Sequence, residues 1–159
     1  MKKIPVTLLF VIKENRILLA LKKCGWRAGI YNGLGGKVEH GETDEQAMVR
    51  EAQEEAGITP VKYEKVAINN YEVYFKGELS NMIVHIYTAS EFKGELTESD
   101  EMKPEWFDID KIPYDRMWSN DVIWIPKVLN GEKFEGHFVM DKDNNLLSHR
   151  IEPRTNFSR

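Results

Sequence analysis

Cysteine is almost missing from this chain, since Cys24 is the only one among its 159 residues. One cysteine cannot form an internal disulfide, and such sparse use of the residue fits a reducing compartment. Nor do the neighbouring residues supply the base that a catalytic thiol needs. The cysteine content therefore predicts a cytoplasmic protein and excludes a fold held together by disulfides.

Long apolar runs are missing as well. No segment is long and apolar enough to span a membrane, so we expect no membrane partner. The N-terminal stretch MKKIPVTLLFVIKENR is basic and then apolar, as in a signal peptide, but its apolar run is short and ends in charged residues without a small-residue cleavage site. A buried strand is the better interpretation of this stretch.

The chain also has no excess of positive charge. Its formal net charge is −4 at pH 7, whereas binding to the phosphate backbone of a nucleic acid requires a basic face. We therefore expect no nucleic-acid polymer as a partner. A small polyanionic ligand held through metal ions remains compatible with this charge.

The composition that is present is globular, with 42% hydrophobic, 30% charged and 11% aromatic residues. The length suits one domain with a real hydrophobic core. Because no repeat, low-complexity tract or linker interrupts the chain, we predict a single domain over residues 1–159, present as a monomer.

The hydrophobic pattern predicts strands on both sides of a central helix. Helices are expected at 44–56 and 119–130, and Pro126 should bend the second helix or mark its start. The glycine-rich stretch 25–41 must be mostly loop. Strands are predicted at 4–12, 17–21, 61–76, 82–92, 105–109, 133–140 and 146–152. This order predicts an α/β sandwich with a mixed sheet.

The helix at 44–56 carries clear signals at both ends. Thr43 is a good N-cap residue, and Gln46 three positions later completes a capping box. Gly57 suits the left-handed position that follows a helix C-terminus. These signals predict the bounds of the helix from local sequence alone.

Three glutamates, Glu51, Glu54 and Glu55, lie at i, i+3 and i+4 on one face of this helix. The wheel places them outside the core, away from the residues that should pack on the sheet: Val49, Ala52 and Ala56. Like charges at this spacing cost about 0.2–0.5 kcal/mol per pair, and divalent cations with oxygen ligands would reverse the sign. From these residues alone, a solvated surface paired loosely with Arg50 and nearby lysines is the more ordinary interpretation.

The loop before the helix, GLGGKVEHGE at 33–42, favours a ligand site because its glycines allow close approach of the backbone. Two common nucleotide-binding patterns are excluded. No GK[ST] follows a suitably spaced glycine, and Val38 occupies the last glycine position of GxGxxG.

Loop and helix together read GKVEHGETDEQAMVREAQEEAGI over residues 36–58, which resembles the Nudix box, G-x5-E-x7-R-E-U-x-E-E-x-G-U, where U is a bulky aliphatic residue. Ala52 departs from the pattern, at a packing position that touches no ligand. The resemblance implies a Nudix α/β/α sandwich with a mixed sheet. The fixed positions are filled by Gly36, Glu42, Arg50, Glu51, Glu54, Glu55, Gly57 and Ile58.

The likeness extends to KKCGWRAGIYNGLGGKVEHGE and ESDEMKPEWFDIDKIPYDRMW, which are similar to stretches of the MutT-like branch of this family that sanitises the nucleotide pool. It implies a Mg²⁺- or Mn²⁺-dependent hydrolase that cleaves 8-oxo-dGTP or a related oxidised purine nucleoside triphosphate to the monophosphate and pyrophosphate. Two alternatives stay open. One is a Nudix hydrolase of an ordinary dNTP or ADP-ribose, and the other is a non-catalytic nucleotide-binding regulator.

The resemblance also implies roles for individual residues. The metal ligands would be the Gly36 carbonyl with Glu51, Glu54, Glu55 and Glu101, and either Glu51 or Glu101 would act as the base. A structural pair, Glu42 and Arg50, would tie the loop to the helix. The substrate would meet Thr7, Lys22, Trp26, Asn32, Lys37, Phe75, Met82, Trp118, Asn120 and Asp121.

Within this substrate set, Lys37 is expected near the phosphates, while Trp118 would stack on the purine and Asn32 would read its edge. Asn120 stands where the branch carries an aspartate next to Asp121. An amide donates and accepts from fixed atoms, whereas a carboxyl changes with protonation. We therefore expect a narrower or shifted choice of oxidised purines. Trp26 replaces a phenylalanine of the branch and should form a larger lid over the base.

Overall fold

The computed structural model describes residues 1–157. Each strand and helix predicted above is present, and most strands run longer than the hydrophobic pattern indicated. The elements are β1 (Lys2–Lys13), β2 (Arg16–Lys22), β3 (Tyr31–Asn32), α1 (Asp44–Ala56), β4 (Thr59–Phe75), β5 (Glu78–Lys93), β6 (Met102–Asp108), a 3₁₀ turn (Tyr114–Arg116), α2 (Asp121–Leu129), β7 (Phe134–Met140) and β8 (Leu146–Pro153).

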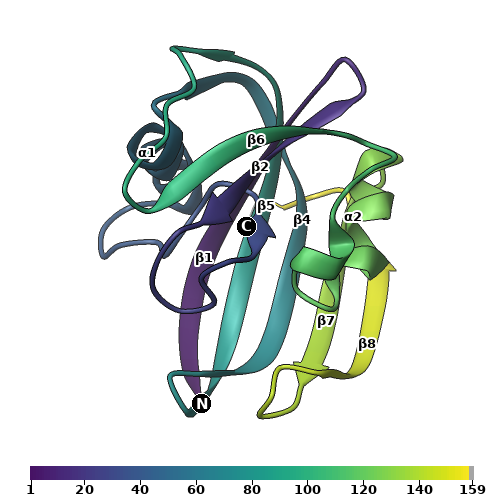
Figure 1. Cartoon of the computed structure of the whole chain (residues 1–159). Helices are drawn as coiled ribbons and strands as arrows, with labels where there is room; N and C mark the ends of the chain where they lie inside the picture. Colours follow the sequence, from purple (N-terminus) through teal and green to yellow (C-terminus); the bar gives the residue numbers. More distant parts are fainter. Residues whose placement is uncertain (158–159) are drawn as a thin grey trace.

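The strands form one mixed sheet in the order β3-β2-β1-β5-β4-β7-β8, with β6 paired to β2. The pairs β1·β5 and β4·β7 are parallel, and the other pairs are antiparallel. Figure 1 shows α1 and α2 on opposite sides of this sheet. The predicted α/β/α sandwich is therefore confirmed.

Strand β1 shows why both faces of the sheet are covered. Its successive side chains alternate, so Leu8 and Phe10 pack in the cluster that contains α2, while Leu9 and Val11 pack in the cluster that contains α1. All four are buried. A strand that is apolar on both faces requires a helix on each, and the sheet obtains them from α1 and α2.

Helix α1 begins and ends where its sequence signals predicted. The Thr43 hydroxyl accepts from the Gln46 N–H at 3.1 Å, and the Gln46 side chain accepts from the Thr43 N–H at 2.9 Å. Gly57 has φ 72°, the left-handed conformation that glycine adopts without strain. Ala52 and Ala56 are fully buried against the sheet.

Two expectations about the helices need correction. Glu55 does not lie outside the core but is buried, with only 3% of its surface exposed. Pro126 does not mark the start of α2, because the helix runs from Asp121 through Pro126 to Leu129; the alternative, that it bends the helix, stays a prediction. The missing N–H costs one bond of the helix, and burial of Trp124, Ile125 and Val128 outweighs that loss.

Within residues 1–157, none of the helices is both long and apolar enough to cross a membrane.

Candidate active site

The glycine loop lies directly along β1, and this contact explains its composition. Leu9 and Leu34 exchange backbone hydrogen bonds of 2.6 and 3.0 Å, and the Thr7 N–H donates to the Gly36 carbonyl at 2.9 Å. A Cβ on Gly35 would come within 1.9 Å of the Thr7 carbonyl oxygen, so no other residue fits there. The strand therefore fixes the position of the Gly36 carbonyl.

Of the three glutamates clustered on α1, two face this loop. Glu55 accepts from the Gly35 N–H at 2.8 Å. The Glu51 carboxylate lies so close to Gly36 that a Cβ there would stand 2.7 Å from its Oε1. Glu54 is turned toward solvent, with 59% of its side chain exposed. The carbonyl of Gly36 and the carboxylates of Glu51 and Glu55 thus share one small region.

Arg50 connects the loop to the helix. Its guanidinium holds the Glu42 carboxylate with two bonds of 2.6 and 3.1 Å, the two-pronged geometry that suits this pair. It also donates to the Lys37 carbonyl at 3.1 Å, to Glu51 at 2.9 Å and to Glu54 at 3.2 Å. The two residues predicted as a structural pair are therefore in direct contact, and Arg50 also touches the acids.

The bonds from Arg50 and Gly35 do not offset the burial of Glu51 and Glu55. Burial raises the pKa of Glu55 to about 8, helped by the charges of Glu51 and Glu101 and opposed by the Gly35 N–H. Burial also raises the pKa of Glu51, against the effect of Arg50. Glu101 is exposed, and its charge reaches both glutamates.

The donor set fits a hard divalent cation, because carboxylate and carbonyl oxygens are the ligands that Mg²⁺ prefers. The missing side chain of Gly36 leaves the space beside Glu51 that such an ion requires. Across residues 1–157, no three acidic, histidine or cysteine side chains converge as a finished metal-binding group. Glu54 is bonded to Arg50 in this structure.

A cavity of about 380 Å³ opens beside Gly36, within the range of small-molecule sites. It is lined by all ten side chains predicted to meet the substrate. The lining also includes three polar side chains that the sequence analysis did not select, those of Arg27, Tyr71 and Lys76.

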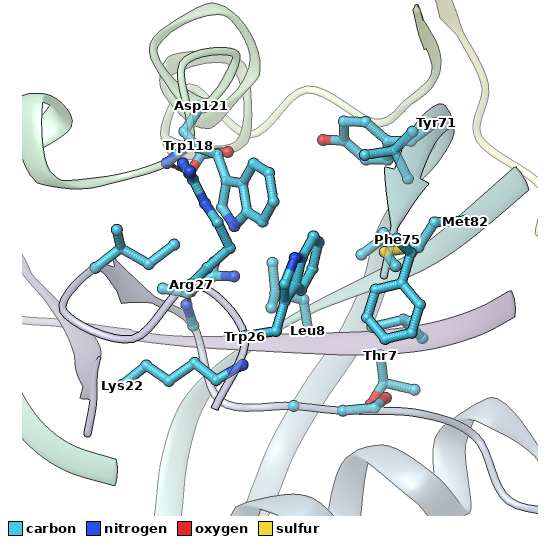
Figure 2. Close-up of a pocket in the computed structure, with 18 of the residues that line it drawn as sticks. Thr7, Leu8, Lys22, Trp26, Arg27, Tyr71, Phe75, Met82, Trp118 and Asp121 are labelled. Atoms are coloured by element: carbon cyan, nitrogen blue, oxygen red, sulfur yellow. Dashed lines mark hydrogen bonds between the residues drawn. The ribbon is translucent and has the colours of Figure 1, made fainter. Parts of the chain in front are cut away.

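Aromatic rings line one part of the cavity. The Trp26 ring lies 5.1 Å from the Trp118 ring and 4.8 Å from the Phe75 ring, between the two in Figure 2. The Arg27 guanidinium lies 4.5 Å from the Trp118 ring, and the Lys37 ammonium lies 4.5 Å from the Phe75 ring. A purine that stacked on Trp118 would thus meet Trp26, as the lid expectation requires.

Polar groups line another part of the cavity. Asn32 accepts from the Gly33 N–H at 2.9 Å, which leaves its amide nitrogen for a ligand. Asp121 is buried and accepts from the Trp118 N–H at 3.2 Å. Burial raises the pKa of Asp121 to about 7, against the bond from the Trp118 N–H and the effect of the nearby Trp124 indole. A carboxyl with this pKa can donate or accept a hydrogen bond near neutral pH.

Tyr71 was missed by the sequence analysis, although a signal for it existed. Side chains two apart on a strand share a face, so Phe75 and Val73 lead back to Tyr71, and all three line the cavity. Tyr71 also pairs directly with Met82 on β5, which was predicted to line the pocket.

A family model described as the NUDIX domain matches residues 1–128. The chain therefore belongs to the Nudix family of hydrolases, which confirms the resemblance drawn from residues 36–58. Members of this family generally need a divalent cation, usually Mg²⁺.

Individual relatives are similar over nearly the whole chain. The oxidized purine nucleoside triphosphate hydrolase of Danio rerio is 45% identical over 147 residues, which cover 92% of this chain and 93% of the relative. The protein of the same name from Mus musculus is 40% identical over 151 residues, or 95% and 96% of the two chains. The crystal structure of a mutator MutT protein from Bacillus halodurans matches with a TM-score of 0.80 and 31% identity, covering 96% of this chain and 99% of that one.

Proposed function

We propose that this protein is a Mg²⁺-dependent pyrophosphohydrolase that converts 8-oxo-dGTP, or a related oxidised purine nucleoside triphosphate, to the monophosphate and pyrophosphate. The observation that carries the proposal is the position of Gly36, which borders the cavity on one side and Glu51 on the other. A base and its phosphates therefore have adjacent sites. The two relatives named for hydrolysis of oxidised purine nucleoside triphosphates support this substrate class.

The residues that would hold Mg²⁺ are the Gly36 carbonyl, Glu51, Glu54, Glu55 and Glu101. The ion supplies neutralisation of phosphate charge and a lowered pKa of bound water. Thr7 holds the Gly36 carbonyl in place through its N–H.

Two acids remain candidates for the base that takes a proton from water. Burial raises the pKa of Glu51, which brings it closer to the range where a general base is effective. Glu101 lies on the exposed loop before β6, close enough for its charge to act on Glu51. Lys22 and Lys37 line the same cavity and would attract the phosphates.

The test is a pyrophosphate-release assay on 8-oxo-dGTP, 2-hydroxy-dATP, dGTP, dATP and ADP-ribose, with and without Mg²⁺. We expect turnover of oxidised purine triphosphates that requires the ion. Glu51→Gln should lower kcat by about 100-fold or more, as loss of a group that acts in the transition state does. The matched control is Glu45→Gln, an exposed acid in the first turn of the same helix.

Two results would contradict the proposal. Faster hydrolysis of ADP-ribose or of ordinary dNTPs would assign the protein to another substrate class. Tight nucleotide binding without any Mg²⁺-dependent turnover would favour the regulator.

We also propose that residues 1–159 form one Nudix domain that acts as a cytoplasmic monomer. The family model stops at residue 128, but β7 pairs with β4 in the central sheet, so the terminal hairpin is part of the same layer. A single mass of about 18.5 kDa by light scattering is the expected result for a monomer, and a doubled mass would refute it.

A further inference from the structure

A buried chain of hydrogen bonds lies behind the polar part of the cavity. The Trp124 indole N–H donates to Asn120 Oδ1 at 2.8 Å, and the Tyr71 hydroxyl donates to the same oxygen at 2.7 Å. The Asn69 amide in turn donates to the Tyr71 hydroxyl at 3.3 Å. Asn69, Asn120 and Trp124 are each no more than 2% exposed. None of these hydrogen bonds has a role in the hydrolysis described above.

These contacts determine which way the Asn120 amide points. An indole N–H can only donate, so the atom it meets must be the amide oxygen and not the nitrogen. The Tyr71 hydroxyl has a single proton and receives a bond from Asn69, so that proton goes to the same oxygen. Both lone pairs of the Asn120 oxygen are then occupied.

What Asn120 can offer a ligand is therefore its NH₂ group. Asn120 lines the cavity. Within residues 1–157, four side-chain polar atoms are buried without a hydrogen-bond partner, and the Asn120 amide nitrogen is not one of them. A carboxyl held by the same two donors would behave differently, because its second oxygen can be protonated or ionised. Asn120 is a donor at every pH near neutrality.

We propose that Tyr71 and Trp124 are positioning residues that fix Asn120 as a pure hydrogen-bond donor, so that the cavity selects purines with a carbonyl at C6 over purines with an amino group at C6. This inference rests on the proposed function and specifies its substrate. Figure 2 shows Tyr71 on the wall of the same cavity as Asp121 and Trp118.

The selection follows from the hydrogen-bonding edges of the two purine types. A 6-oxo purine presents an acceptor beside an N–H donor, which suits Asn120 as the donor and Asp121 as the acceptor. A 6-amino purine presents a donor in place of that acceptor, so it opposes the Asn120 NH₂ group. The preference arises as much from the repulsion between the Asn120 NH₂ group and a 6-amino group as from the bond between the Asn120 NH₂ group and a 6-oxo group.

The experiment compares 8-oxo-dGTP with 2-hydroxy-dATP, an oxidised purine that keeps its 6-amino group. We expect the wild type to favour 8-oxo-dGTP in kcat/KM by about tenfold or more. Asn120→Asp should reduce that ratio by at least about fivefold, since the carboxylate can accept from the amino group. Tyr71→Phe should reduce it by about two- to fivefold, because Trp124 alone then holds the amide.

The matched control is Tyr74→Phe, which removes a hydroxyl from the same strand at a position that does not line the cavity. A purely structural defect lowers turnover of both substrates and leaves their ratio unchanged. In ¹⁵N-labelled protein, the Asn120 side-chain amide and the Trp124 indole resonances should shift in Tyr71→Phe and stay in place in Tyr74→Phe.

Binding of the monophosphates 8-oxo-dGMP and 2-hydroxy-dAMP by calorimetry separates the two proposals. Equal affinity of the wild type for both would overturn the selection by Asn120, whatever the turnover. A preference for 8-oxo-dGMP without any triphosphate hydrolysis would support the selection and overturn the proposed function. An unchanged preference in both Tyr71→Phe and Asn120→Asp would remove these residues from base recognition.

Discussion

Asp121→Asn should change how the stability of the protein depends on pH. Asp121 is 3% exposed, and burial raises its pKa from 3.8 to about 7. Because its pKa is higher in the folded protein than in the unfolded chain, the folded state binds an extra proton between about pH 4 and pH 7. The free energy of unfolding of the wild type therefore falls as pH rises through this range, and the contribution is constant above it.

The size of the effect follows from the same values. Each pH unit between the two pKa values is worth about 1.4 kcal/mol, so the rise from 3.8 to about 7 corresponds to about 4 kcal/mol. The asparagine variant has no proton to bind at this position. Its stability relative to the wild type should increase by about 2–3 kcal/mol between pH 5 and pH 8.

Urea unfolding at 25 °C and pH 5, 6, 7 and 8, without added metal, measures the difference directly. With a typical slope for a small domain, the variant's midpoint should gain about 1 M or more in urea relative to wild type across this range. Asp110→Asn is the control, since Asp110 is exposed. Parallel pH profiles for wild type and Asp121→Asn would show that the carboxyl is ionised in the fold, and would refute the reasoning.

Three further changes test the site. Gly36→Ala should lower turnover at least about tenfold and raise the Mg²⁺ concentration for half-maximal activity, because its Cβ would stand 2.7 Å from Glu51 Oε1; an unchanged Mg²⁺ titration would contradict this. Arg50→Lys should cost about 1–3 kcal/mol in urea unfolding, since lysine cannot hold Glu42 with two bonds; unaltered stability would make that pair irrelevant to the fold. Trp26→Ala should raise KM for 8-oxo-dGTP by about tenfold with little change in kcat, as loss of a stacking surface does; the opposite split would place Trp26 in the chemical step.

Local signals in the sequence predicted most of the fold. The capping box at Thr43 and the left-handed Gly57 gave the bounds of α1, because each depends only on neighbouring residues. Burial of Glu55 could not be predicted in this way. The helix wheel gives directions around the helix axis, but the Gly35 N–H that covers Glu55 comes from a loop placed by pairing with β1.

The contacts in the polar part of the cavity could not be predicted from the sequence either. The sequence indicated Asn120 as a substrate-binding residue, but the orientation of its amide also depends on the Tyr71 hydroxyl from β4, which reaches it only in the folded protein. Tyr71 stands 49 positions away from Asn120 in the chain. Contacts over such a separation leave no periodic trace in a single sequence.

The bond between the Thr7 N–H and the Gly36 carbonyl makes β1 a rigid spacer between two parts of the site. Thr7 and Leu8 belong to the cavity wall, and the Gly36 carbonyl belongs to the acidic region, so one strand sets the separation between them. A nucleotide bound at both places is thus selected by the distance from its base to its phosphates as well as by the identity of its base. Nucleotides with a different spacing would seat the base correctly and still present the wrong bond to the acids.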